Sequence, residues 1–379
     1  MIFNDYSGAY SAQGEQTLGG RLLRQLNLDA PLLFALAMLS VAGLAILYGA
    51  SGEDADMVYR QALRLLLSFG VLLVVAQIPP HLLKLWTPWL FGFGLLLLFV
   101  TLEAGHIGRG AQRWLSLGVV RFQPSEIMKI AVPMMVGWYL HDRALPPGWR
   151  ELLVLGLVIG LPVALVAVQP DLGTALLIAS SGLFGVFLAG LRWRVILLLL
   201  VLVAIATPIG WHFLHGYQRT RVLTFLNPER DPLGAGYHII QSEIAIGSGG
   251  VFGKGWLHGS QSQLDFLPES STDFIFAVLG EEFGLLGALA LIVLYGFIIA
   301  RSLLIALRAQ DTFSRLLAGA LSMAFFTYAF INTGMVAGLV PVVGVPLPLI
   351  SYGGTSMMTL MAGFGILMSI HSHRKLVST

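Results

Sequence analysis

Residues 30–50 read APLLFALAMLSVAGLAILYGA, and no charged residue occurs from position 30 to position 52. A helix needs about 20 mostly apolar residues to cross a bilayer, so this stretch is long enough to span one. The whole chain has the same character: 56% of its 379 residues are hydrophobic, 11% are charged, and the mean hydropathy is +0.80. Because an ordinary soluble domain carries about 25% charged residues, the sequence predicts a polytopic membrane protein and excludes a soluble enzyme.

Further apolar runs follow the first, without the alternation of apolar and polar residues that is typical of a membrane β-barrel. They predict an all-α polytopic membrane protein with about ten transmembrane helices. The predicted spans are residues 30–50, 61–78, 81–102, 123–140, 152–168, 172–190, 194–211, 274–300, 314–338 and 350–370.

Lys and Arg are enriched in the cytoplasmic connections of membrane proteins, and their distribution predicts the orientation. With the N-terminus inside, the cytoplasmic segments hold twelve, namely Arg21, Arg24, Lys84, Arg143, Arg150, Arg192, Arg194, Arg301, Arg308, Arg315, Arg374 and Lys375. The short outer loops hold five, namely Arg60, Arg64, Arg109, Arg113 and Arg121. We therefore expect a cytoplasmic segment at 1–29 without a cleavable signal, a transmembrane domain at 30–370 and a cytoplasmic tail at 371–379.

Charge and cysteine content exclude other classes of function. The formal net charge of +2 creates no basic field for nucleic acid. The absence of cysteine removes disulfides, Cys-ligated zinc and thiol nucleophiles. The His-rich ending at 371–375 is interpreted as an interfacial anchor rather than a metal site.

One outer connection, residues 212–273, is far longer than a compact domain normally needs. It lies between the seventh and eighth predicted helices, and its mixed composition predicts an ordered periplasmic loop. Residues 237–245 have helical spacing, with Ile239, Ile240, Ile244 and Ala245 expected on one face. We interpret this stretch as an amphipathic helix at the outer interface. The glycine-rich run 247–255 lacks the Walker A spacing, so it predicts a tight turn.

Charged residues within or beside the spans are candidates for function, because each costs about 2.5–3.5 kcal/mol at mid-membrane. Glu126 and Lys129 are three residues apart, which places them on one helical face. They form either a structural ion pair or a polar cavity that meets the substrate. Within the eighth span, Glu281 and Glu282 need a partner or a cavity, and the sequence does not decide between them.

Two aspartates begin predicted helices. Asp171, after Pro170, is either an N-cap or a functional carboxylate. Asp273 closes the long outer loop and is a candidate general base, cation ligand or helix cap. Arginines beside aromatic residues form a second outer group that could bind either a pyrophosphate or lipid head groups. They are Arg109, Arg113, Arg219 and Arg221.

Four motifs together resemble the SEDS family, named for shape, elongation, division and sporulation. They are QPDLGT at 169–174, GAGYH at 234–238, LPESSTDFIFAVLGEE at 267–282 and PLPLISYGG at 346–354. The order and coverage match from the first span to the C-terminus. The segment GLVPVVGVP at 338–346 is similar to the elongation branch found in rod-shaped Gram-negative bacteria rather than to the division branch.

The resemblance implies a peptidoglycan glycosyltransferase of the bacterial inner membrane that polymerises lipid II and releases undecaprenyl pyrophosphate. It implies partnership with a class B penicillin-binding protein and other membrane proteins of the elongation machinery, and it maps the essential carboxylate onto Asp273. Other sensitive polar positions map onto Glu126, Lys129 and Asp171. A bound Mg²⁺ or Mn²⁺ held by Asp273 is the rival role for that residue. The alternative functions are a lipid II flippase and a non-catalytic scaffold.

Overall fold

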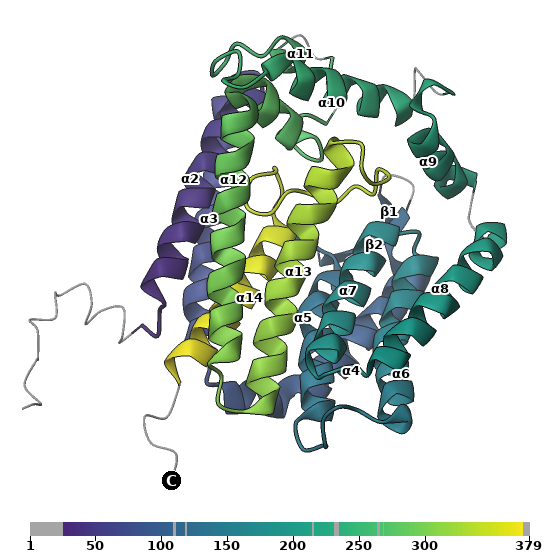
Figure 1. Cartoon of the computed structure of the whole chain (residues 1–379). Helices are drawn as coiled ribbons and strands as arrows, with labels where there is room; N and C mark the ends of the chain where they lie inside the picture. Colours follow the sequence, from purple (N-terminus) through teal and green to yellow (C-terminus); the bar gives the residue numbers. More distant parts are fainter. Residues whose placement is uncertain are drawn as a thin grey trace, which may run out of the picture.

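The computed structural model describes residues 26–108, 111–117, 120–213, 216–230, 235–263, 266–267 and 269–373. Its long helices stand side by side as a bundle, with shorter helices across one end (Figure 1). The long helices are α2 (Ala30–Ala50), α3 (Ala55–Ala76), α4 (Pro80–Ala104), α5 (Pro124–Leu140), α6 (Trp149–Val168), α7 (Leu172–Leu188), α8 (Trp193–Phe213), α12 (Ile275–Leu307), α13 (Thr312–Val336) and α14 (Thr355–Ser372).

Each of these helices overlaps one of the predicted spans. By length and composition, six helices among the described residues can cross a membrane: α2, α3, α4, α6, α12 and α13. Helix α7 and the first part of α8, residues 193–202, are shorter apolar stretches. The chain is therefore a multi-pass helical membrane protein, and the count of ten spans stays a prediction. Buried apolar side chains form one cluster among α2, α3 and α12–α14 and another centred on α4–α7.

Helix boundaries differ from the prediction where a helix continues beyond its apolar run into polar residues. Helix α3 begins at Ala55, because Asp54 caps it by accepting a hydrogen bond from the Met57 amide. Between α4 and α5 the structure forms an unpredicted antiparallel sheet in the order β1-β2-β3. Its strands are β1 (His106–Gly108), β2 (Ala111–Leu117) and β3 (Val120–Phe122).

The long connection at 212–273 is built from ordered elements that lie over one end of the bundle (Figure 1). They are α9 (Gly216–Leu226), the 3-10 turn η1 (Pro228–Arg230), α10 (Ala235–Gly249) and α11 (Ser260–Gln263). The predicted helix is present as α10, but its predicted face is partly wrong. Ile239 and Ala245 are buried whereas Ile244 is 45% exposed. The buried stripe also includes Ser242, whose hydroxyl donates to the carbonyl of Val336 at the end of α13.

The glycine-rich run ends α10 and then forms a turn, as predicted. The same turn supplies hydrogen-bond acceptors to the backbone of α12 where that helix is kinked. Helix α12 is kinked at Gly284, which has φ 65° and ψ −162°. There the amides of Leu285 and Leu286 donate to the carbonyls of Gly250 and Val251, at 3.0 and 3.2 Å. Because a buried backbone group left without a partner is costly, this turn stabilises the kink.

Gly253 is a position in the glycine-rich run that tolerates no side chain, as is Gly249 at the end of α10. The φ of Gly253 is +79°, and a Cβ would overlap the carbonyl oxygen of Glu282. Gly250 is a matched control, since its φ is +57° but nothing lies within 4 Å of its Cβ position. We expect Gly250→Ala to cost about 1–2 kcal/mol from its backbone conformation alone and Gly253→Ala to cost more. Thermal unfolding of the detergent-solubilised variants measures the difference, and equal unfolding temperatures would contradict the close packing.

At the opposite end of the bundle, Asp29 joins three helices that are distant in sequence. Its carboxylate caps α2 through the Leu32 amide and accepts two hydrogen bonds from Arg301 of α12, at 2.6 and 3.0 Å. His371 of α14 lies 3.3 Å away. Burial raises the pKa of Asp29, but the hydrogen bonds from Arg301 and the Leu32 amide, with the nearby positive charges, hold that pKa below its ordinary value.

The lowered pKa predicts how stability depends on pH. A depressed carboxyl pKa contributes stability above the ordinary value of 3.8, and this contribution is lost as the pH falls through the lower folded value. We expect Asp29→Asn to lower the unfolding temperature at pH 7, with the difference from wild type shrinking below about pH 4. Asp311→Asn is the control, because Asp311 caps α13 through the Ser314 amide without a described ion pair. A difference that stays constant down to pH 3 would contradict the ion pair.

Candidate functional site

The candidate site is organised around residues 342–345, an irregular segment between α13 and α14, here called the central segment. Gly344 has φ +76°, and a Cβ there would lie 3.5 Å from Oδ2 of Asp273, so the carboxylate of Asp273 lies against this glycine. Asn332 of α13 donates through Nδ2 to the carbonyls of both Asp273 and Val345, each at 2.8 Å. A buried amide thus holds the aspartate and the central segment together.

The backbone before Asp273 is fastened on two further sides. The Tyr352 amide donates to the carbonyl of Ser271 at 2.9 Å, and the Ser351 hydroxyl donates to that of Thr272 at 2.5 Å. Ser270 donates to the carbonyl of Ala50 at the end of α2. These contacts fix the position of Asp273 where the long connection enters α12, on which a catalytic carboxylate would depend.

Asp171 approaches the central segment from the start of α7. Its carboxylate caps α7 through the amide of Thr174, which confirms the N-cap interpretation, and also accepts from Gln123 at 3.1 Å. Arg113 of β2 lies 3.6 Å from Oδ2 of Asp171 and donates to the carbonyl of Pro170. Gly173, the second residue of α7, packs closely against the central segment. A Cβ at Gly173 would lie only 3.0 Å from the carbonyl oxygen of Val343.

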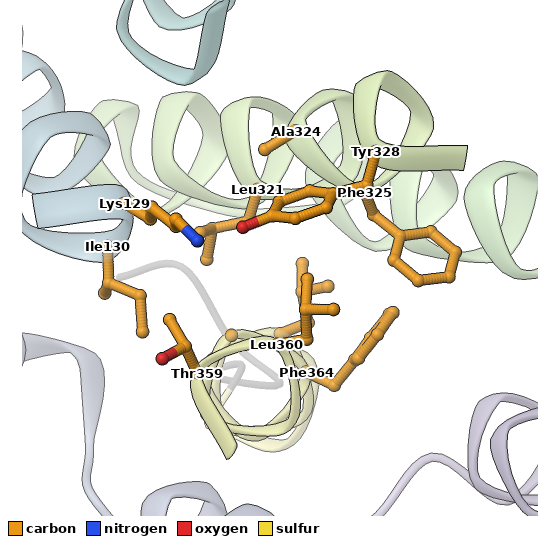
Figure 2. Close-up of a pocket in the computed structure, with 11 residues that line it drawn as sticks. Lys129, Ile130, Leu321, Ala324, Phe325, Tyr328, Thr359, Leu360 and Phe364 are labelled. Carbon is orange, nitrogen blue, oxygen red and sulfur yellow. The ribbon is translucent and has the colours of Figure 1, made fainter. Parts of the chain in front are cut away.

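Glu126 and Lys129 form a buried ion pair on α5, with 2.7 Å between Oε1 and Nζ. They are 4% and 8% exposed. Lys129 also lies over the ring of Tyr328 on α13, with 5.2 Å from Nζ to the centroid, and its amine points into the gap between α13 and α14 (Figure 2). Tyr328 packs in one cluster with Val345, which connects this pair to the central segment.

A small cavity of about 30 Å³ lies beside Lys129, lined by Tyr328, Thr359 and apolar residues of α13 and α14 (Figure 2). A wider groove of about 250 Å³ opens next to it between α4, α5 and α14. Glu126, Ile130 and Thr359 line the groove, and the last two also line the cavity. Oε2 of Glu126 is buried without a hydrogen-bond partner among the described residues. A polar end on an otherwise apolar groove suits an amphiphilic ligand.

The predicted outer arginines differ in their contacts. Arg219 donates to the carbonyls of Trp211 and His212, so it satisfies free carbonyls at the end of α8. Arg221 donates to the carbonyl of Val342 at 3.2 Å and therefore contacts the central segment directly. Arg109 lies outside the described residues.

The structure thus brings Asp273, Asp171 and Arg221 to the central segment and connects Glu126 and Lys129 to it through Tyr328. Glu281 belongs elsewhere, because its buried carboxylate accepts from Lys254 at 2.7 Å and from the Gln261 amide. Within the described ranges, no group of three His, Cys, Asp or Glu side chains could hold a metal ion. A cation held by Asp273 with waters or substrate phosphates needs no such group, so that role of Asp273 stays a prediction.

Sequence reasoning missed two amides that hold this site. Asn332 is described above, and Gln61 of α3 donates to the carbonyl of Ser351 at 3.0 Å. Both are almost fully buried. Their signal in the sequence is a lone amide near or within an apolar span, where polar side chains find partners on neighbouring helices.

Comparison with known proteins agrees with the motifs and the geometry. The family model described as cell cycle protein, covering FtsW, RodA and SpoVE, matches residues 25–376. The chain belongs to this family. The FtsW/RodA/SpoVE relatives include the peptidoglycan glycosyltransferase MrdB of Escherichia coli K12, 54% identical over 93% of this chain and 96% of the relative. The peptidoglycan glycosyltransferase RodA of Treponema pallidum is 32% identical over 91% and 98%.

Solved structures of the same family share the fold. A structure described as structural coordination of polymerization and crosslinking by a peptidoglycan synthase complex has a TM-score of 0.80 and 31% identity, covering 92% of this chain and 99% of the other. The rod shape determining protein RodA of Thermus thermophilus has a TM-score of 0.69 and 28% identity, covering 92% and 98%. These matches confirm the family and the helical membrane fold expected from the four motifs.

Proposed function

We propose that this protein is a peptidoglycan glycosyltransferase that polymerises lipid II into glycan strands during cell elongation. The observation that carries the proposal is the 54% identity over 93% of the chain to a peptidoglycan glycosyltransferase. The clustering of its charged residues around the central segment supports it.

In the proposed reaction, Asp273 acts as general base. The GlcNAc 4-hydroxyl of the acceptor lipid II loses its proton to the Asp273 carboxylate as its oxygen attacks the anomeric carbon of the donor. The new glycosidic bond forms while the bond from that carbon to the pyrophosphate oxygen breaks, with inversion. A positioned carboxylate contributes roughly 10²–10⁴-fold to such a step. The hydrogen bonds on both sides of Asp273 support its positioning.

The leaving undecaprenyl pyrophosphate needs cations at the place where its negative charge develops. Lys129 and Arg221 are the candidate cations, because both are connected to the central segment. Arg113 and Asp171 instead hold the start of α7 in place. Arg219 fits a capping role better, because its guanidinium already serves two backbone carbonyls. Glu126 orients Lys129 through their ion pair.

We place the protein in the bacterial inner membrane, with both termini in the cytoplasm and Asp273 facing the periplasm. The distribution of Lys and Arg over the connections supports this orientation. We divide the chain into an N-terminal segment at 1–29, the transmembrane domain at 30–370 with its loop at 212–273, and a tail at 371–379. The partner is a class B penicillin-binding protein, in agreement with the synthase complex that shares the fold.

The test is lipid II polymerisation by the purified protein bound to its penicillin-binding partner, with the transpeptidase blocked so that only glycan growth is scored. Long glycan strands on a denaturing gel are the expected result. No polymer from the intact complex, together with movement of lipid II across vesicle membranes, would replace the proposal by a flippase. If the intact complex shows neither activity, the non-catalytic scaffold is the remaining function.

A further inference from the structure

Arg64, on the third turn of α3, is a cation that the mechanism above does not use. Its guanidinium carbon lies 4.4 Å from the centroid of the Tyr352 ring. Its side chain is half-buried and forms no ion pair or hydrogen bond with any residue that the structure describes. Stacking on an aromatic ring fixes the plane of a guanidinium but leaves the N–H donors at its edge available for an anion.

The turn beneath Arg64 is the same one that fastens the Asp273 loop. The Tyr352 amide donates to the carbonyl of Ser271, two residues before Asp273. Gln61, about one helical turn before Arg64 on α3, donates to the carbonyl of Ser351, the residue before Tyr352. The Cβ position of Gly354 lies 3.6 Å from Cδ and Nε of Arg64, so the arginine packs over a backbone without a side chain. Nothing lies within 4 Å of the Cβ position of Gly353, so the turn next to Gly354 is also open at that residue.

Chemistry decides which ligand fits. A planar guanidinium with free edge donors binds phosphate oxygens bidentately. Helix α3 packs along α14, and Lys129 and Thr359 line the cavity beside α14. Arg64 thus lies beside Gly354 at the start of α14, and the cavity of Lys129 and the apolar groove lie further along the same helix. A membrane-borne ligand with two phosphates would find charge at the first place and room for its chain at the second.

We propose that Arg64, oriented by Tyr352, is a binding residue for the diphosphate group of a polyprenyl lipid at the site. This inference rests on the proposed function for the identity of that lipid. Because Arg64 contacts the phosphate before and during the reaction alike, it contributes to binding rather than to the chemical step.

The test measures binding without turnover. The protein is placed in nanodiscs of pure phosphatidylcholine, and the Kd for undecaprenyl diphosphate is compared among wild type, Arg64→Gln and Arg64→Lys. We expect Arg64→Gln to weaken binding roughly tenfold or more, since charge-assisted hydrogen bonds differ from neutral ones by that order. Arg64→Lys keeps the charge without the bidentate geometry, so its Kd is expected between those of wild type and Arg64→Gln. Arg315→Gln, an exposed arginine at the start of α13, is the matched control and keeps the wild-type Kd.

Polymerisation kinetics and a second variant complete the test. Arg64→Gln raises KM for lipid II with kcat changed by less than about twofold, as expected for uniform binding. Tyr352→Leu has the same effect, and adding it to Arg64→Gln weakens binding no further. An unchanged Kd in a folded Arg64→Gln protein would overturn the proposal. So would a change that occurs only when phosphatidylglycerol is added, because Arg64 would then bind lipid head groups. Wild type that binds the diphosphate lipid but makes no glycan contradicts the proposed function instead.

Discussion

We expect Asp273→Ala and Asp273→Asn to lower the rate of glycan polymerisation by about 10²–10⁴-fold, because the acceptor hydroxyl would then lose its proposed base. The structure indicates that both variants keep the loop in position without the carboxylate. The backbone carbonyl of residue 273 accepts from Asn332, and the carbonyls of residues 272 and 271 accept from Ser351 and Tyr352. The measurement is initial-rate polymerisation of lipid II by the complex with its partner, with unfolding temperatures as the check on folding.

Glu269→Gln is the control for this experiment. Glu269 is an exposed carboxylate four residues earlier in the same loop, and its Oε2 accepts from the Thr272 hydroxyl at 2.6 Å. Removing its charge tests whether any negative charge in the loop affects the rate. Wild-type rates from Glu269→Gln and near-zero rates from folded Asp273 variants support Asp273 as the base. Equal polymer from wild type and Asp273→Ala would remove Asp273 from the mechanism.

The second large effect is expected from Lys129→Met, which leaves Glu126 buried without its cation. Breaking a buried ion pair by removing one partner costs about 3–5 kcal/mol, because the remaining charge is uncompensated. The double variant Glu126→Gln with Lys129→Met removes both charges and recovers most of that stability. Thermal unfolding of the three proteins in one detergent measures the difference.

The same double variant decides between the two roles of the ion pair that the sequence leaves open. A stable double variant that polymerises lipid II at the wild-type rate means that Glu126 and Lys129 only join helices. A stable double variant that binds the diphosphate lipid weakly and makes little glycan means that Lys129 meets the substrate. The cavity beside Lys129 and the groove beside Glu126 lead us to expect the second result.

Much of the helical architecture was predictable because the bilayer imposes it. A span must satisfy its own backbone hydrogen bonds and present apolar side chains to lipid, so each long helix is already visible as an apolar run. Residues 30–50 are the clearest example, and α2 has the same bounds as that prediction. The sheet β1-β2-β3 and the exposure of Ile244 were not predictable, because short strands and the faces of an outer helix depend on what packs against them.

The sequence by itself determined the class of protein and its family, and the family resemblance maps the proposed base onto Asp273. It also included the ion pair of Glu126 with Lys129 and the N-cap role of Asp171 among its alternatives, because both are local interactions over three residues. Only the tertiary structure decided that Asp273, Asp171, Arg221 and Asn332 meet at one segment of the chain, and that Arg64 lies over Tyr352. These contacts join positions that are far apart in sequence. No local pattern encodes them, since they exist only once the helices pack.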